Sequence, residues 1–227
     1  MKFEDVDIIR SKRKTISIEI QEDGHVFIRA PFRASAHVLQ EFFREKHDWI
    51  ERGVKKQKRL FAKRPKRCFE HGENFLYLGN PMELNIRSKR GIRGRPLEVS
   101  DALYLCPSAK HQARSVIERW YRSRARFVFQ ERAEFYAPHM QVMFGTIRLS
   151  SANTRWGSCG SKNSLNFNWR LIMAPVEVID SVIVHELAHC KYKNHGQRFW
   201  QFVHTHCSQY PTHDKWLKTH AHSLHWD

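Results

Sequence analysis

Hydrophobic and polar residues alternate in two short runs near the start of the chain, at residues 15–20 and 25–30. Alternation with a period of two is typical of a strand with one buried face. Asp23 and Gly24 lie between the runs and favour a tight turn. We therefore predict a β-hairpin that ends at Pro31.

Beyond the hairpin the pattern takes the period of a helix. Apolar side chains between residues 35 and 60 recur at three- and four-residue intervals, as one buried helix face requires, and Ser35 stands where an N-cap is expected. The same period predicts helices over residues 111–136, 175–192 and 197–207. Strands are predicted over residues 73–86 (two strands around Gly79), 147–153 and 165–171.

This order of elements predicts an α+β fold. A strand-rich N-terminal region with one helix spans residues 1–105, and a helix-rich region spans residues 106–227. In the second region we expect the apolar helix near residue 183 to pack under a small mixed sheet. We expect the two regions to form one continuous compact unit.

Composition narrows the class of protein. With 227 residues, of which 41% are hydrophobic and 12% aromatic, the chain can bury a core and is not a disordered protein. The first residues are too acidic for a signal peptide, and no apolar run approaches the roughly 18 residues of a membrane span. We therefore expect a cytoplasmic protein with no membrane partner. The five scattered cysteines form no Cys-x-x-Cys pair, which argues against a disulfide framework.

The chain is strongly basic, with 39 Lys and Arg against 23 Asp and Glu and a formal charge of +16. Such an excess favours a polyanionic partner, and the basic segments at residues 52–67 and 87–95 could contact nucleic acid or a nucleotide. Neither segment has interleaved aromatic residues of the kind that stack on bases. Solvated charged loops are the plainer interpretation.

The chemistry concentrates in the sequence His-Glu-Leu-Ala-His at residues 185–189. On a helix, His185 and His189 lie one turn apart on the same face, so both imidazoles can reach one metal ion. Glu186 leaves the helix in a different direction, which places its carboxylate beside the metal rather than on it. A buried glutamate without a partner would be costly, and a metal-activated water would resolve that cost.

A catalytic zinc ion needs a third protein ligand and one open position. His195 is the natural candidate, because its spacing from the first two histidines equals that of the metzincins. Tyr192 replaces the glycine of the metzincin turn, so we expect a different path into His195. Three later histidines could compete for the third place: His204, His206 and His213. Three histidines near the end are expected at the surface: His220, His222 and His225.

Three blocks of sequence together resemble the YgjP-like metallopeptidase family, a zincin group related to WLM and SprT-like domains. They are residues 155–159 (Arg-Trp-Gly-Ser-Cys), residues 165–171 with Pro175, and residues 185–200, from the first histidine of the motif to Phe199 and Trp200. The resemblance implies a zincin-like fold and a peptidase that binds one divalent metal, most simply Zn²⁺. It also implies that His185, His189 and His195 are the metal ligands and Glu186 the catalytic glutamate.

Further residues are weaker candidates for substrate binding. The predicted strand 165–171 could form the sheet edge on which an extended peptide adds, with Asn166, Asn168 and Arg170 on its outer face. Arg155 and Tyr192 could stabilise a developing oxyanion. Cys159 could be a redox site or part of a second metal site, but a structural thiol is the plainer interpretation because no partner cysteine is close in sequence.

The residues predict a zinc-dependent hydrolase that cleaves amide bonds in a peptide or protein, with Glu186 as general base. Two alternatives stay open. The basic charge suits a metal-dependent nucleoside triphosphate pyrophosphohydrolase, although no Gly-rich phosphate loop is present. A basic nucleic-acid-binding protein with a structural zinc is the other, and it would need a fourth protein ligand.

Overall fold

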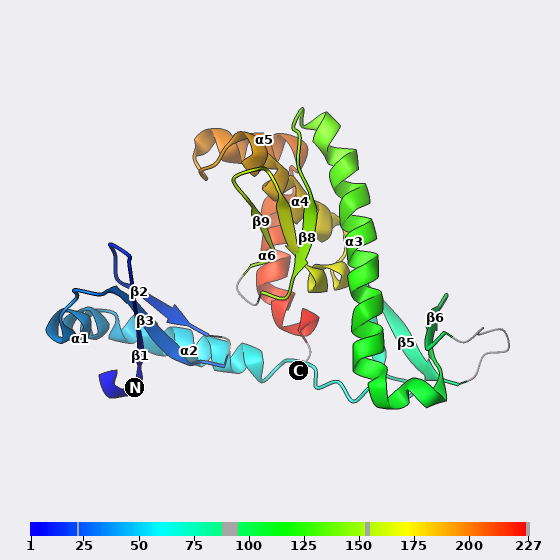
Figure 1. The fold of residues 1–227 in the computed structure, drawn as a ribbon, viewed down its shortest axis with the longest axis horizontal. Helices are drawn as coiled ribbons and strands as arrows, with labels where there is room; N and C mark the ends of the chain where they lie inside the picture. Colours follow the sequence, from blue (N-terminus) through cyan, green and yellow to red (C-terminus); the bar gives the residue numbers. More distant parts are fainter. Residues whose placement is uncertain (22, 88–94, 153–154, 226–227) are drawn as a thin grey trace. The chain divides into compact units, whose positions relative to one another are not determined.

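The computed structural model describes residues 1–227 except residues 22, 88–94, 153–154 and 226–227. The chain folds into an N-terminal unit, Met1–Pro65, and a C-terminal unit, Lys66–Asp227, which Figure 1 colours along the sequence. Helices and small mixed sheets occur in the described parts of the chain, which confirms the α+β class. Short 3₁₀ helices lie at Phe3–Asp5, Pro107–Gln112, Trp169–Met173 and Ala221–Leu224.

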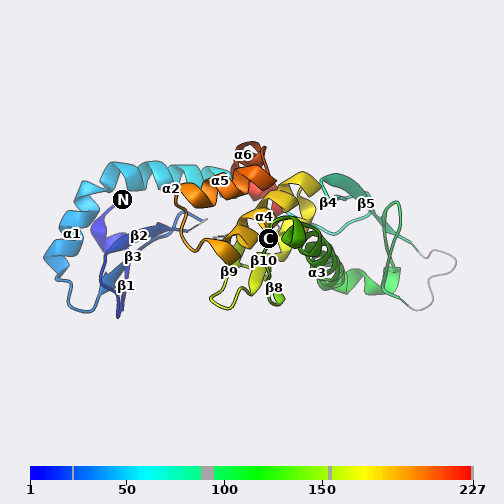
Figure 2. The same cartoon turned by 90° about the horizontal axis from the view of Figure 1, so that it is seen from above.

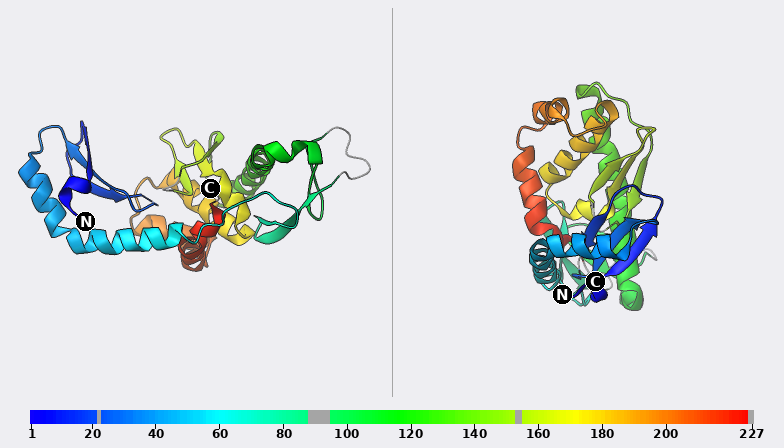
Figure 3. Two further views of the ribbon diagram at one scale, coloured as in Figure 1. Left: turned by 90° about the horizontal axis from the view of Figure 1, so that it is seen from below. Right: turned by 90° about the vertical axis from the view of Figure 1, so that its left-hand side faces the viewer.

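The N-terminal unit contains the predicted hairpin. Strand β2 (Ser17–Ile20) pairs antiparallel with β3 (Val26–Pro31), and β1 (Asp7–Ser11), which was not predicted, adds parallel to β3. The single helix expected after Ser35 is divided at Lys46 into α1 (Ala36–Glu45) and α2 (His47–Phe61). The strands lie along one face of α2 (Figure 3). A separate core, which includes the fully buried Ile28, Leu39 and Ile50, closes between strands and helices.

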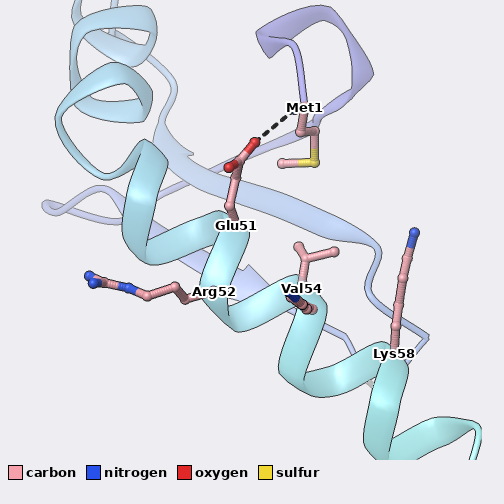
Figure 4. Close-up of a pocket in the computed structure, with 6 residues that line it drawn as sticks. Met1, Glu51, Arg52, Val54 and Lys58 are labelled. Atoms are coloured by element: carbon pink, nitrogen blue, oxygen red, sulfur yellow. Dashed lines mark hydrogen bonds and ion pairs between the residues drawn. The ribbon is translucent and has the colours of Figure 1, made fainter.

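A surface pocket of this unit lies beside α2 (Figure 4). The carboxylate of Glu51 points to the amino group of Met1 at 3.3 Å, while Arg52 leaves the helix on another side. The pocket is also lined by Val54, Lys55 and Lys58. The pocket therefore offers charge but no histidine or cysteine for metal chemistry.

The C-terminal unit is built along the long helix α3 (Ala113–His139), the tall green helix of Figure 1. One sheet on this helix has the order β4-β5-β7-β6. Its strands are β4 (Asn74–Tyr77), β5 (Asn80–Ile86), β6 (Leu97–Val99) and β7 (Leu103–Leu105). Within the described residues, no helix has both the length and the apolar character needed to cross a bilayer.

The boundary between the units differs from the division expected between residues 105 and 106. Strand β7 pairs in parallel with β5, and the buried Leu84 and Leu103 share a core with Ile117 and Tyr121 of α3. Residues 66–105 therefore belong with the helices that follow them. The second basic segment, at residues 87–95, lies almost wholly outside the described residues.

A second sheet has the order β8-β10-β9. Strand β10 (Leu165–Asn168) pairs parallel with β8 (Ile147–Ser150) and antiparallel with β9 (Gly157–Cys159). The helices that follow are α4 (Val176–Lys191), α5 (Gln197–His206) and α6 (Tyr210–His220). Helix α4 lies between this sheet on one side and α5 and α6 on the other (Figure 2). An apolar helix under a small mixed sheet was predicted and is confirmed.

Two details of this sheet correct the sequence-based prediction. The strand expected over residues 165–171 ends at Asn168, whose side-chain oxygen accepts a hydrogen bond from the backbone N–H of Arg170 and caps a 3₁₀ helix. This strand is also the centre of the sheet and not its edge. The edge next to α4 is β9, which the Gly-Ser-Cys sequence at residues 157–159 did not reveal.

Candidate metal centre

Three imidazoles converge at the end of helix α4. His185 and His189 lie one turn apart on the helix, and His195 comes from the segment between α4 and α5. The Nε2 atom of His195 is 3.1 Å from the Nε2 atoms of both His185 and His189. The chain turns towards them because α4 ends at Lys191 and Tyr192 is extended, with φ −122° and ψ 109°.

Neighbouring groups fix the orientation of two of these rings. The Nδ1 of His189 donates to the backbone carbonyl of Tyr192 at 3.0 Å, which leaves a lone pair on Nε2. The Nδ1 of His185 lies 3.0 Å from the hydroxyl of Tyr210, the first residue of α6. Aromatic rings pack behind the cluster, with His189 stacked on Phe199 and His195 stacked on Trp200. Each imidazole therefore turns its Nε2 towards the same point.

Burial favours the neutral form of His185 and His189. Burial, and after it the neighbouring His189 and His195 rings, lower the pKa of His185 to about 4. Burial also lowers the pKa of His189. Neutral imidazoles whose lone pairs face one another repel unless a cation lies between them, and neutral imidazole is the form that binds metals.

Glu186 directly follows His185 on α4 but is not part of the cluster. Its side chain is buried, with the residue 5% exposed, and its Oε2 has no hydrogen-bond partner among the described residues. Burial raises the pKa of this carboxyl to about 7, although the positive charge of Arg155 opposes that rise. The carboxylate lies so close to the backbone of Gly157 that a Cβ there would be 2.6 Å from its Oε1. Strand β9 therefore backs the carboxylate directly.

The residues fit a divalent metal. Nitrogen donors of the three histidines lie within 4.8 Å of one another and, among the described residues, the cluster includes no fourth histidine, cysteine, aspartate or glutamate. The donor set thus leaves room for a further ligand, and Oε2 of Glu186, the residue after His185, has no hydrogen-bond partner among the described residues.

The other histidines considered for the third position lie elsewhere. His204 packs on Trp200, His206 packs on Phe202, and His213 lies 3.8 Å from the sulfur of Cys207. None of them is in the cluster of three.

The three histidines near the end do not all lie at the surface. His220 stacks on Trp216, and His225 is buried against Trp156. The prediction of a surface position was wrong for His225, because the last 3₁₀ helix turns the chain back onto the core through the buried Leu224.

Several residues that were weaker candidates for substrate binding use their side chains in structural contacts instead. Asn168 is buried and uses both ends of its amide, donating to the carbonyl of Ala152 and capping the 3₁₀ helix. The guanidinium of Arg170 lies over the Trp169 ring, and the ring of Tyr192 packs on Phe202. These side chains hold the scaffold, and Tyr192 serves the cluster through its backbone carbonyl.

Asn166 and Arg155 are nearer to the candidate site. Asn166 stands on β10 opposite Ser158 of the edge strand. Arg155 is exposed just before β9, and its charge acts on Glu186. The structure also adds Gly157 and Tyr210, which the sequence did not single out because their roles depend on contacts between distant segments.

The fold and the cluster define a class of protein, an α+β protein with a helix-borne histidine site that can hold a metal ion. Comparison with known families then gives the family: the profile described as "YgjP-like, metallopeptidase domain" matches residues 14–220. The chain belongs to the YgjP-like metallopeptidase family. No curated protein and no solved structure matches the chain with significance.

Proposed function

We propose that this chain is a zinc-dependent peptidase whose metal is held by the Nε2 atoms of His185, His189 and His195. The observation that carries the proposal is the convergence of three imidazoles next to a buried glutamate whose Oε2 has no hydrogen-bond partner among the described residues. The family supports a metal-dependent peptidase of this kind. A donor set of three, without a fourth protein ligand among the described residues, is typical of catalytic rather than structural zinc.

His185, His189 and His195 would hold the zinc ion, which would act as a Lewis acid and make water a nucleophile near neutral pH. Glu186 then acts as general base: it accepts the proton of the attacking water and returns it to the leaving amine. Its burial keeps solvent from competing for that proton, and the backbone of Gly157 limits where the carboxylate can move.

The edge strand β9 is the expected docking place for substrate. Its inner side pairs with β10, with Gly157 opposite Phe167 and Cys159 opposite Leu165. As the outermost strand of the order β8-β10-β9, it can pair on its other side with an extended peptide. A peptide bound there would lie along the strand that backs Glu186, which suits hydrolysis of a peptide bond.

The substitution Glu186→Gln tests the proposal. It keeps the size of the side chain but removes the base, so we expect bound zinc to be unchanged and kcat to fall by about 10²–10⁴-fold. Glu177→Gln is the matched control, because Glu177 lies on the exposed side of the same helix. Both variants are measured by metal analysis and by cleavage of a peptide library.

A pyrophosphate-release assay, run beside the peptide-cleavage assay, separates the peptidase from the phosphoanhydride hydrolase. Release of pyrophosphate from nucleoside triphosphates without peptide cleavage would replace the peptidase by the phosphoanhydride hydrolase. Full activity of Glu186→Gln would show that Glu186 is not the general base.

A further inference from the structure

Two cysteines that are far apart in sequence meet beside the candidate metal centre. Cys159 ends the edge strand β9, Cys190 lies in the last turn of α4, and their sulfur atoms are 3.9 Å apart. Both side chains are half-buried, so small solutes can reach them. The sequence favoured a structural thiol because no cysteine is close to Cys159 in sequence, but the fold brings Cys190 beside it from 31 residues away.

The two segments that carry these thiols are held together by other contacts. The Nζ of Lys193, just after α4, donates to the side-chain oxygen of Asn163 in the β9–β10 loop at 2.8 Å. Two residues before Cys159, the backbone of Gly157 lies against Glu186. The two sulfur atoms therefore meet across a packed contact, and a disulfide bond of about 2.05 Å requires them to come roughly 1.9 Å closer.

We propose that Cys159 and Cys190 are a redox pair that closes to a disulfide when the protein meets hydrogen peroxide. One thiol reduces the peroxide, forming a sulfenic acid and one water. The sulfur of the other cysteine then attacks the sulfenic sulfur, the S–S bond forms and a second water leaves. Two thiols and one peroxide thus give one disulfide and two waters, and a thiol reductant reverses the change.

The disulfide would act on the candidate active site through β9. The bond draws the end of this strand towards α4, and the same strand backs Glu186 and offers the substrate edge. Because there is no space between Gly157 and the carboxylate, a shift of β9 must move Glu186. The effect on turnover rests on the proposed peptidase function, whereas the formation of the disulfide does not.

The experiment oxidises the zinc-loaded full chain with one equivalent of hydrogen peroxide, followed by non-reducing peptide mapping by mass spectrometry. We expect a cross-linked peptide that joins Cys159 to Cys190, with the loss of two hydrogen atoms, and its disappearance on reduction. Peptide cleavage should fall by roughly 10- to 100-fold and recover on reduction, because a misplacement of about 1 Å can cost that much. Cys159→Ser and Cys190→Ser should each keep full activity after peroxide, whereas the matched control Cys106→Ser should respond as the wild type does.

Cross-links that leave out either cysteine, or no intramolecular cross-link at one equivalent, would overturn the redox pair. A Cys159–Cys190 cross-link with unchanged peptide cleavage would overturn the proposed effect of the disulfide on the candidate active site. If no peptide is cleaved under any condition, the mapping still decides whether the pair exists, and only the proposed function fails.

Discussion

Glu186 is confined by a glycine, and this contact makes Gly157 the most sensitive neighbour of the proposed general base. A Cβ at position 157 would lie 2.6 Å from both Cγ and Oε1 of Glu186. We predict that Gly157→Ala displaces the carboxylate and lowers kcat roughly 10- to 100-fold with little loss of bound zinc. Gly196→Ala is the control, because a Cβ there meets nothing within 4 Å although His195 is adjacent. Equal activities for the two variants in peptide cleavage would contradict this role.

Two tyrosines contact the histidine cluster in different ways, one through its hydroxyl and the other through its backbone carbonyl. The hydroxyl of Tyr210 lies 3.0 Å from Nδ1 of His185, whereas Tyr192 meets His189 through its carbonyl. Outer hydrogen bonds of this kind orient a metal-binding imidazole, and their loss typically costs about 10- to 100-fold in metal affinity. Tyr210→Phe should weaken zinc binding by that factor in a competitive chelator titration, and Tyr192→Phe should leave it unchanged. An unchanged affinity for Tyr210→Phe would assign this hydroxyl to packing alone.

At the residue scale, the sequence predicted the features of the candidate site that depend on residue spacing within one helix. His185, His189 and Glu186 depend on helical geometry over five residues, and the cluster of three histidines agrees with that spacing. The contacts of Gly157, Tyr210 and Cys190 join segments that lie far apart in the chain. No periodicity records such pairs, so they required the structure.

At the scale of elements, α4 is fixed to α3 by an ion pair whose carboxylate is buried. Arg132 of α3 donates to both carboxylate oxygens of Asp180 on α4, and the hydroxyl of Tyr136 donates to the same group at 3.0 Å. Asp180 is 8% exposed. This contact lies five residues before His185, so it sets the position of the helix that carries the cluster.

Removal of the buried carboxylate should therefore destabilise the C-terminal unit. Asp180→Ala leaves Arg132 and the hydroxyl of Tyr136 without their shared acceptor, and we expect the free energy of unfolding to fall by about 1.5–3 kcal/mol. Lys218→Ala breaks an exposed pair with Asp214 instead and should cost less than about 1 kcal/mol. Urea denaturation followed by tryptophan fluorescence compares the two, and equal losses would show that burial of the Asp180 carboxylate contributes nothing.

The sheet shows why the elements were only partly predictable. Alternation located β10 at Leu165–Asn168, but its place in the centre depends on partners on both sides. Strand β9 has three residues, Gly-Ser-Cys, whose composition does not suggest a strand. The edge that faces α4 could be assigned only after the pairing of these strands was known.

For the whole molecule, the two units have separate cores, and all three histidines of the candidate metal centre lie in the C-terminal unit. Leu39 is fully buried in the N-terminal core. Leu39→Ala should lower the stability of that unit by about 2–5 kcal/mol, since it removes buried apolar volume. We expect zinc affinity to stay at the wild-type value, measured by the same chelator titration. A parallel loss of zinc would show that the units act as one.

The central claim is that three histidines hold one zinc ion with a place left beside Glu186. X-ray absorption at the zinc edge of the loaded full chain tests it most directly. We expect three imidazole nitrogens at about 2.0–2.1 Å and one further light-atom ligand from solvent. A sulfur ligand from Cys190, a fourth imidazole, or a shell that is unchanged in His195→Ala would contradict it.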